Sequence, residues 1–148
     1  LASYAPLFNR IGHSQWKPDM IWFDDSDVYL TPNYYVQKLF ANHRGTYTIP
    51  LQKQDVKLRK EGIYVSAAVD AQGEIILKLV NTNHREYALM LEDADGLAVR
   101  TTGQMWTLRG TGEMPEDRPE VSAVTEETAE IDGCVFIPAQ SLVVIRYQ

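Results

Sequence analysis

Closely spaced carboxylates are the first residues in this chain whose type and spacing could do chemistry. Asp24, Asp25 and Asp27 follow an apolar run, and side chains of this kind can bind calcium. Counted from Asp24 or Asp25, however, the segment lacks the oxygen ligand, the glycine and the final glutamate that a calcium loop requires at fixed positions. It is therefore interpreted as a turn, and no metal site is predicted.

Residues for nucleophilic or acid–base catalysis are equally sparse. The three histidines, His13, His43 and His84, are far apart in the sequence and form no metal-binding pair. Neither a Gly-x-Ser-x-Gly motif nor a phosphate-binding glycine loop occurs, so a serine hydrolase and a nucleotide cofactor have no support. The single cysteine, Cys134, lies in an apolar run and is predicted to be a buried structural thiol. We expect neither a catalytic residue nor a cofactor in this chain.

Tryptophan rings can stack on sugar rings when a protein surface presents them to solvent. Trp22 lies in an apolar run and Trp106 in the middle of a strand-like segment, so both are predicted to pack in the core. Trp16 differs because polar residues surround it over 12–18. Of the three tryptophans, Trp16 is the candidate for a functional role.

Composition and charge narrow the choice of partners. The chain has 148 residues, enough for one sizeable core, and a net charge of −6 without the Lys and Arg clusters that nucleic-acid binding needs. No apolar run approaches the roughly 20 residues that span a membrane. Residues 113–132 hold eight acidic residues and one basic residue, Arg118, and are predicted to form a solvated loop. Nucleic acid and membranes are not expected as partners.

One helix is predicted over residues 31–44. Thr31 is a suitable N-cap, and Pro32 stands at the first helical position, where its missing N–H costs nothing. Apolar residues one turn apart then form a stripe: Tyr35, Val36, Leu39 and Phe40. Gly45 is the expected C-terminal stop.

The rest of the chain has the pattern of strands. Alternating apolar residues over 63–69 and 74–80 flank a turn at 70–73 and predict a hairpin. Further strands are predicted at 87–91, 97–101, 105–109, 134–137 and 141–147. Short strands at regular intervals, without a helical pattern between them, indicate an all-β fold, an antiparallel and jelly-roll-like β-sandwich.

Four segments together resemble a known enzyme family. They are residues 1–8 (LASYAPLF), 16–23 (WKPDMIWF), 31–40 (TPNYYVQKLF) and the closing 137–144 (IPAQSLVV). In type and order they resemble the α-L-arabinofuranosidases of glycoside hydrolase family 51. The resemblance extends over the whole chain, is specific over 1–45 and at the end, and rests on strand spacing over 46–133.

The resemblance implies that the chain has two parts. Residues 1–45 would be the C-terminal remnant of a catalytic (β/α)₈ barrel, including its last helix, and residues 46–148 would be the C-terminal β-sandwich. A full barrel takes about 250 residues, so both catalytic glutamates of the retaining enzyme are expected upstream of Leu1. The apolar start without an initiator methionine also predicts a piece of a longer protein. We therefore expect this fragment alone to be inactive.

The implied parent enzyme releases terminal non-reducing α-L-arabinofuranosyl residues from arabinan or arabinoxylan. Because the exit of a barrel strand faces the substrate, Tyr4, Asn9 and Trp16 become candidates for the rim of the substrate pocket. The main partner would be the missing barrel of the same polypeptide. The family implies secretion or a periplasmic location and leaves a homo-oligomer open. The alternative is an independent carbohydrate-binding or protein-interaction module, which would need no barrel-like segment over 3–8.

Overall fold

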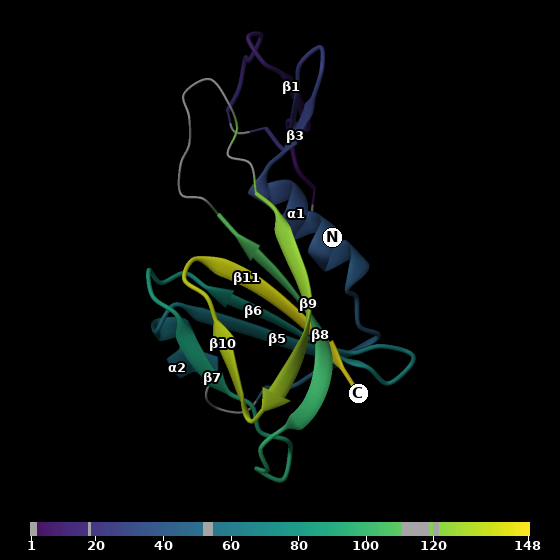
Figure 1. The fold of residues 1–148 in the computed structure, drawn as a ribbon, viewed down its shortest axis with the longest axis vertical. Helices are drawn as coiled ribbons and strands as arrows, with labels where there is room; N and C mark the ends of the chain where they lie inside the picture. Colours follow the sequence, from purple (N-terminus) through teal and green to yellow (C-terminus); the bar gives the residue numbers. More distant parts are fainter. Residues whose placement is uncertain (1–2, 18, 52–54, 111–118, 120–121) are drawn as a thin grey trace.

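The computed structural model describes residues 3–17, 19–51, 55–110, 119 and 122–148 (Figure 1). Within these residues the chain forms eleven strands and two helices. In chain order they are β1 (Phe8–Arg10), β2 (Ile21–Phe23), β3 (Val28–Leu30), α1 (Pro32–Asn42), β4 (Tyr47–Ile49), α2 (Asp55–Lys60), β5 (Ile63–Val69), β6 (Ile75–Asn81), β7 (Tyr87–Met90), β8 (Arg100–Arg109), β9 (Val124–Asp132), β10 (Cys134–Ile137) and β11 (Ser141–Tyr147). Neither helix is long and apolar enough to cross a membrane, as far as the described residues extend.

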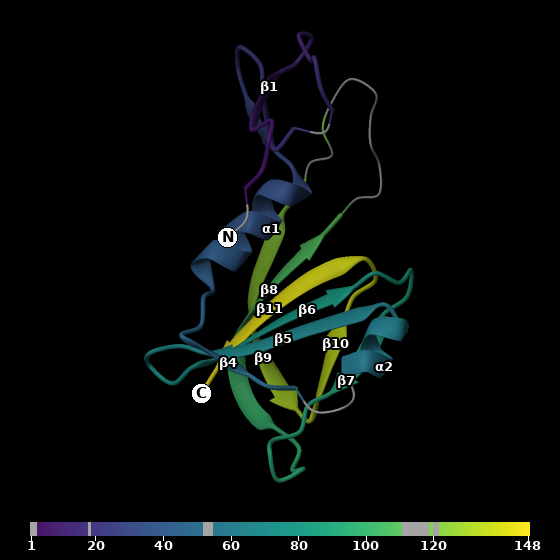
Figure 2. The same ribbon diagram turned by 180° about the vertical axis from the view of Figure 1, so that it is seen from behind.

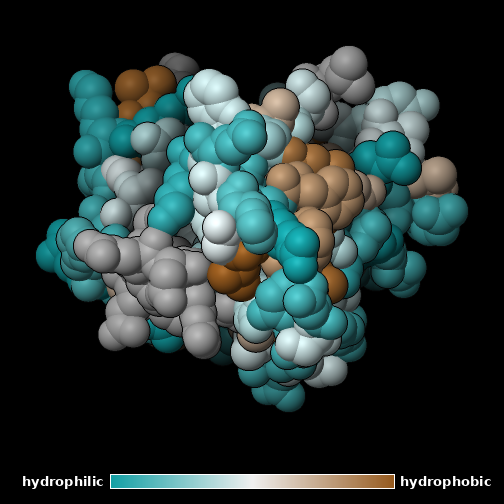
Figure 3. All heavy atoms as spheres, turned by 90° about the horizontal axis from the view of Figure 1, so that it is seen from above, coloured by the Kyte–Doolittle hydropathy of each residue, from teal (hydrophilic) through white to brown (hydrophobic). Residues whose placement is uncertain are grey.

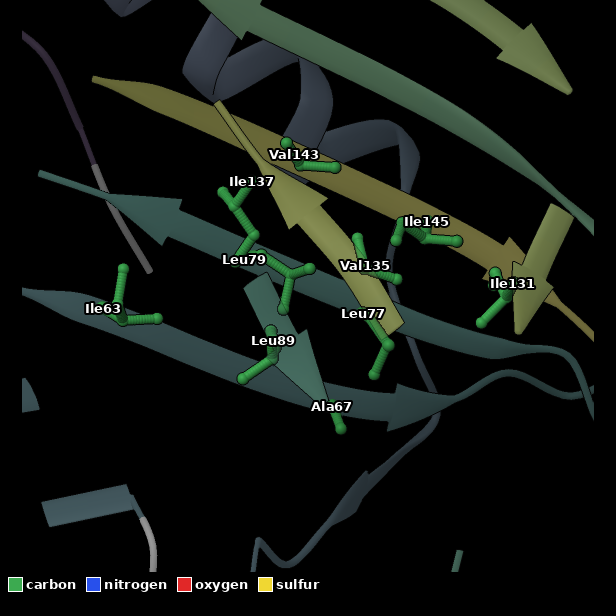
Figure 4. Packing of buried hydrophobic residues seen from close by; sticks show 10 residues of the cluster. All are labelled: Ile63, Ala67, Leu77, Leu79, Leu89, Ile131, Val135, Ile137, Val143 and Ile145. Atoms are coloured by element: carbon green, nitrogen blue, oxygen red, sulfur yellow. The ribbon is translucent and has the colours of Figure 1, made fainter. Parts of the chain in front are cut away.

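The main body is an antiparallel β-sandwich, as predicted. Its large sheet has six strands in the order β4-β5-β6-β11-β8-β9, and its small sheet pairs β7 with β10 (Figures 1 and 2). Apolar side chains from both sheets meet between them, as Figure 4 shows. This sandwich core consists of Ile63, Ala67, Leu77, Leu79, Leu89, Ile131, Val135, Ile137, Val143 and Ile145.

The predicted hairpin forms from β5 and β6. The pairing runs from Ile63 opposite Asn81 to Val69 opposite Ile75, so the alternating apolar residues of both strands face the sandwich core. Arg146 of β11 secures the turn, donating to Asp70 Oδ2 at 2.6 Å and to the carboxylate of Glu74. The predicted hairpin is confirmed, with the second strand one residue further along the chain, at Ile75–Asn81, than the pattern over 74–80 indicated.

Strand β11 is buried on both faces. Val143 and Ile145 belong to the sandwich core, whereas Leu142 and Val144 face the opposite side and contact α1 through Leu39. This second core, the helix-side cluster, consists of Leu39, Ile76, Leu108, Leu142 and Val144. Because α1 covers the outer face of the sheet, both alternating sets of β11 are apolar.

Helix α1 lies within the predicted range, but its ends are built differently. Thr31 is the N-cap, yet its hydroxyl donates to the carbonyl of Met20 at 2.7 Å and caps no helical N–H. The helix ends at Asn42, before Gly45, and Gly45 does not adopt the left-handed conformation of a helix stop. A Cβ at Gly45 would lie 2.4 Å from the Cβ of Ala68. Glycine is needed there because the chain passes close against β5.

The prediction of a solvated loop over 113–132 is wrong for its second half. Residues Val124–Asp132 form β9, which pairs with β8 along its whole length. The remainder, apart from Pro119, Ser122 and Ala123, lies outside the described residues. Strand β9 is an edge strand whose glutamates are exposed, and charge on an edge protects a sheet from pairing with other chains. Because this segment is rich in acidic residues, its sequence did not indicate the strand that it forms.

Three smaller expectations also need correction. The strands predicted at 97–101 and 105–109 are largely one strand, β8, because Gly103 continues the pairing instead of breaking it. The short helix α2 was not predicted, since its Val56 is exposed and only Leu58 packs against the sandwich core. Cys134 is half-buried rather than buried, because its strand turns Val135 and Ile137 inward instead.

The segment before α1 forms a small sheet of its own. Strand β1 pairs in parallel with β2, and β2 pairs in antiparallel fashion with β3. Trp22 of β2 is buried, and its Nε1 donates to the carbonyl of Asp19 at 3.0 Å. This confirms the predicted core position of Trp22. Trp106 packs against the helix-side cluster and is half-buried.

Candidate functional site

The loop that follows β1 presents an exposed tryptophan. Trp16 is 69% exposed, whereas Asn9 of β1 is 6% exposed and lies opposite Trp22 in the parallel pairing. Two of the three residues predicted for the pocket rim therefore lie near one another but differ in access. The Trp16 side chain is open to solvent, whereas the Asn9 side chain is buried beneath the loop.

A chain of two hydrogen bonds joins Asn9 to the backbone of Trp16. Asn9 Nδ2 donates to Ser14 Oγ at 3.0 Å, and Ser14 Oγ donates to the carbonyl of Trp16 at 2.8 Å. The N–H of His13 also donates to the carbonyl of Arg10 at 3.0 Å, closing the turn that begins the loop. Ser14 was not among the predicted site residues. Its position two residues before the singled-out tryptophan was the only signal for it in the sequence.

Tyr4, the third predicted rim residue, is tied to helix α1. Its hydroxyl accepts a hydrogen bond of 3.1 Å from Asn33 Nδ2, in the first turn of the helix. Tyr4 thus links the segment before β1 to α1, whereas Asn9 and Trp16 share the loop after β1.

The acidic turn between β2 and β3 is organised around Asp24. Its Oδ1 accepts from the N–H groups of Ser26 and Asp27 at 2.8 and 2.9 Å, and its Oδ2 accepts from the Tyr29 hydroxyl at 2.9 Å. These bonds lower the pKa of Asp24 to about 2. The turn prediction is confirmed. Among the described residues, no three acidic, histidine or cysteine side chains converge as metal ligands would.

One face of the β1–β3 sheet is apolar and open. Phe8 is 62% exposed and Val28 is 64% exposed, and both line a hollow of about 550 Å³ with Ile21 and Phe23. We call this set the β1–β3 apolar face. Figure 3 views the molecule from the end that carries β1 and β3, and apolar side chains are grouped there among polar ones.

A second hollow, of about 420 Å³, lies between α1 and strands β8 and β9. His43 and Trp106 line it, with ring centroids 4.2 Å apart, together with Tyr35, Asn42 and Glu126. Burial lowers the pKa of His43, and the positive charges of Arg146 and Lys78 lower it further. This pair was not predicted, because His43 and Trp106 are far apart in the chain.

The fold therefore defines a β-sandwich domain that carries a short β/α segment on its outer face. The segment holds an exposed tryptophan and an open apolar face. The family model of the α-L-arabinofuranosidase C-terminal domain matches residues 1–139, and the chain belongs to that family.

Curated relatives carry the same description. The chain is 31% identical over 150 residues to α-L-arabinofuranosidase 1 of Arabidopsis thaliana, a match that covers 95% of this chain and 22% of that protein. It is 46% identical over 50 residues to an extracellular exo-α-L-arabinofuranosidase of Streptomyces chartreusis, covering 34% of this chain and 6% of that protein. The chain thus spans about a fifth of the Arabidopsis relative.

Solved structures share the fold. An arabinose-bound α-L-arabinofuranosidase of glycoside hydrolase family 51 superposes with a TM-score of 0.77 at 24% identity, covering 97% of this chain and 23% of that one. The thermostable family 51 enzyme of Thermotoga petrophila gives a TM-score of 0.62 at 18% identity, with coverages of 88% and 31%. The resemblance to this family expected from the sequence is confirmed.

Proposed function

We propose that this chain is the non-catalytic C-terminal part of a retaining α-L-arabinofuranosidase. The complete enzyme would hydrolyse terminal non-reducing α-L-arabinofuranosyl residues of arabinan or arabinoxylan. Its two catalytic glutamates, about 5–5.5 Å apart as retention requires, would come from a (β/α)₈ barrel encoded before residue 1. The family match over residues 1–139 carries this proposal.

The division of the chain follows from the same proposal. Residues 1–45 would complete the barrel, with α1 as its last helix, and residues 46–148 would form the accessory sandwich. The β1–β3 apolar face supports this division, because Phe8 and Val28 are exposed side by side with Ile21 and Phe23 on one small sheet, where a neighbouring domain would cover them. Their cover would be the barrel of the same polypeptide.

Helix α1 would serve both parts. Its Leu39 is buried in the helix-side cluster, while Phe40 is 43% exposed. Lys78 Nζ lies 4.5 Å from the centroid of the Phe40 ring and tethers the helix to the sheet by a cation–π contact. The sandwich would thereby hold the last helix in place, and with it the strand exit and the loop that carries Trp16.

The substrate-pocket rim would include Tyr4, Asn9 and Trp16, with Asn9 acting through the loop that it supports. The complete enzyme would act outside the cell or in the periplasm, where its polymeric substrates are found. The extracellular Streptomyces relative supports secretion.

The test compares this chain with the full-length polypeptide. An aryl α-L-arabinofuranoside should be hydrolysed by the full-length protein, with arabinose released first as the same anomer, and not by residues 1–148 alone. Turnover by the short chain that disappears when one of its own carboxylates is replaced would contradict the proposal. Absence of activity in both, with binding of arabino-oligosaccharide to the short chain, would favour an independent carbohydrate-binding module.

A further inference from the structure

The loop over 11–17 is fixed at several points around a side chain that is left exposed. The Asn9–Ser14–Trp16 bonds secure its centre, and Lys17 Nζ lies 5.9 Å from the ring centroid of the buried Trp22. Trp16, 69% exposed, is the one large apolar side chain that this described loop presents to solvent. Fixing the backbone of an exposed tryptophan costs conformational entropy, which a bound partner can repay.

The surroundings of Trp16 favour a polar partner. Its neighbours His13, Ser14 and Gln15 are all exposed and polar. The β1–β3 apolar face is different, since Phe8, Ile21, Phe23 and Val28 lie together there, beside the acidic turn over 24–27. An indole ring within a polar rim suits a ligand with one apolar face and many hydroxyl groups, which is the chemistry of a sugar ring.

We infer that Trp16 is a stacking platform for the sugar unit next to the arabinofuranosyl residue that is cleaved, and that Ser14 is its positioning residue. The inference rests on the proposed function, because the loop follows a strand whose exit would face the substrate. Ser14 does not touch the sugar. Its hydroxyl accepts a hydrogen bond from Asn9 and donates one to the Trp16 carbonyl. It therefore anchors the loop to β1.

The experiment uses the full-length polypeptide and two substrates. Linear arabinotriose offers a sugar ring to Trp16, whereas methyl α-L-arabinofuranoside offers none. Trp16→Ala should raise the KM for arabinotriose about ten-fold, the loss expected for one stacked ring. Ser14→Ala should raise it about three-fold, the effect of one hydrogen-bonded anchor. Both substitutions should raise the KM for arabinotriose more than the KM for the methyl glycoside, because the methyl glycoside has no second ring to stack on Trp16.

Three further variants separate positioning from general damage. Ser14→Thr, which keeps the hydroxyl, should restore the KM for arabinotriose. The double variant Ser14→Ala/Trp16→Ala should be no worse than Trp16→Ala, because Ser14 acts through Trp16. Ser26→Ala removes an exposed hydroxyl of the β2–β3 turn and serves as the matched control with unchanged kinetics.

The possible outcomes are distinct. Equal losses on both substrates, together with a lower melting temperature for Trp16→Ala, would identify Trp16 as a contact with the barrel and overturn the inference. An unchanged KM for arabinotriose in Trp16→Ala would also overturn it. If the unmodified polypeptide releases arabinose from neither substrate, the proposed function itself fails, independently of any variant.

Discussion

His43 lies at the junction between helix α1 and the large sheet. It caps the helix through its backbone N–H, which donates to the carbonyl of Leu39 at 3.0 Å. Its ring packs against Trp106, and its Nδ1 is buried without a hydrogen-bond partner among the described residues. Burial is the largest cause that lowers the pKa of His43, and the positive charges of Arg146 and Lys78 lower it further. The negative charge of Glu126 raises it. The folded chain therefore favours the neutral imidazole.

This environment predicts that lowering the pH destabilises the packing of α1 against the large sheet. Because the pKa of His43 is lower in the folded chain than its ordinary value of 6.5, the unfolded chain binds more protons below that pH. The contribution of His43 to stability is complete above 6.5 and is lost as the pH falls toward the folded-state pKa. Urea unfolding of His43→Gln at about pH 7.5 and about pH 5 should show a smaller fall in midpoint than the unmodified chain.

His84 is exposed and provides the matched control substitution. His84→Gln should not reproduce the effect of His43→Gln, because the His84 side chain lies in solvent and not in the hollow beside α1. An identical fall in His43→Gln and the unmodified chain would show that carboxylates alone cause the acid sensitivity.

At the scale of elements, the chain that leaves α1 passes so close to β5 that the side chain allowed at Gly45 is restricted. A Cβ at Gly45 would lie 2.4 Å from Ala68 Cβ and 3.1 Å from the Val69 carbonyl oxygen. We expect Gly45→Ala to lower the free energy of unfolding by about 1–3 kcal/mol, the range for overpacking. Chemical denaturation of the isolated chain measures this directly.

A second substitution on the facing strand tests the cause of that loss. Ala68→Gly removes the nearest clashing atom, so the double variant Gly45→Ala/Ala68→Gly should recover part of the stability that Gly45→Ala loses. Additive losses in the double-mutant cycle would mean that the Ala68 methyl group is not the cause of the loss in Gly45→Ala.

The sequence predicted most of the sandwich and missed elements whose burial is one-sided or weak. Alternation located β5, β6, β10 and β11, because each places apolar residues on a buried face. It missed β9, which is rich in exposed glutamate. This strand is held by its pairing with β8 and by the burial of Ile131. It also missed α2, too short for an apolar stripe to be visible. The alternation of apolar residues in a sequence indicates which strands have a buried face. It does not indicate a strand that is held at a sheet edge mainly by backbone pairing.

The candidate site was harder to predict than the fold. Trp16 could be singled out because a large aromatic residue in a polar loop conflicts with its usual burial. Ser14 could not be singled out, because its hydrogen bonds to Asn9 and Trp16 form only when the loop folds back over β1. The His43–Trp106 contact could not be predicted either, because the two residues are far apart in the chain and meet only when α1 packs against β8.

At the scale of the whole molecule, the β1–β3 apolar face should make the isolated chain self-associate. Replacing Phe8 and Val28 together with serine removes two of its most exposed apolar side chains. We expect the double variant to remain monomeric at concentrations at which the unmodified chain forms dimers or larger species, because the driving force is burial of this surface. Sedimentation velocity over a concentration series measures the change.

Met90 offers a control of similar exposure on strand β7, away from the β1–β3 sheet. Met90→Ser should leave the self-association unchanged. A concentration-independent monomer for the unmodified chain, or an equal effect of Met90→Ser, would contradict a docking role for the β1–β3 apolar face.

The place of β11 in the large sheet also determines the order in which the sandwich can assemble. β11 lies between β6 and β8, and it follows both of them in the chain. During synthesis, the β5–β6 hairpin and the β8–β9 pair are therefore complete while the strand that joins them has not yet been made. Until β11 enters, each pair exposes an unpaired edge and apolar side chains. The large sheet can therefore close only late, when β11 inserts between the two strand pairs that precede it in the chain.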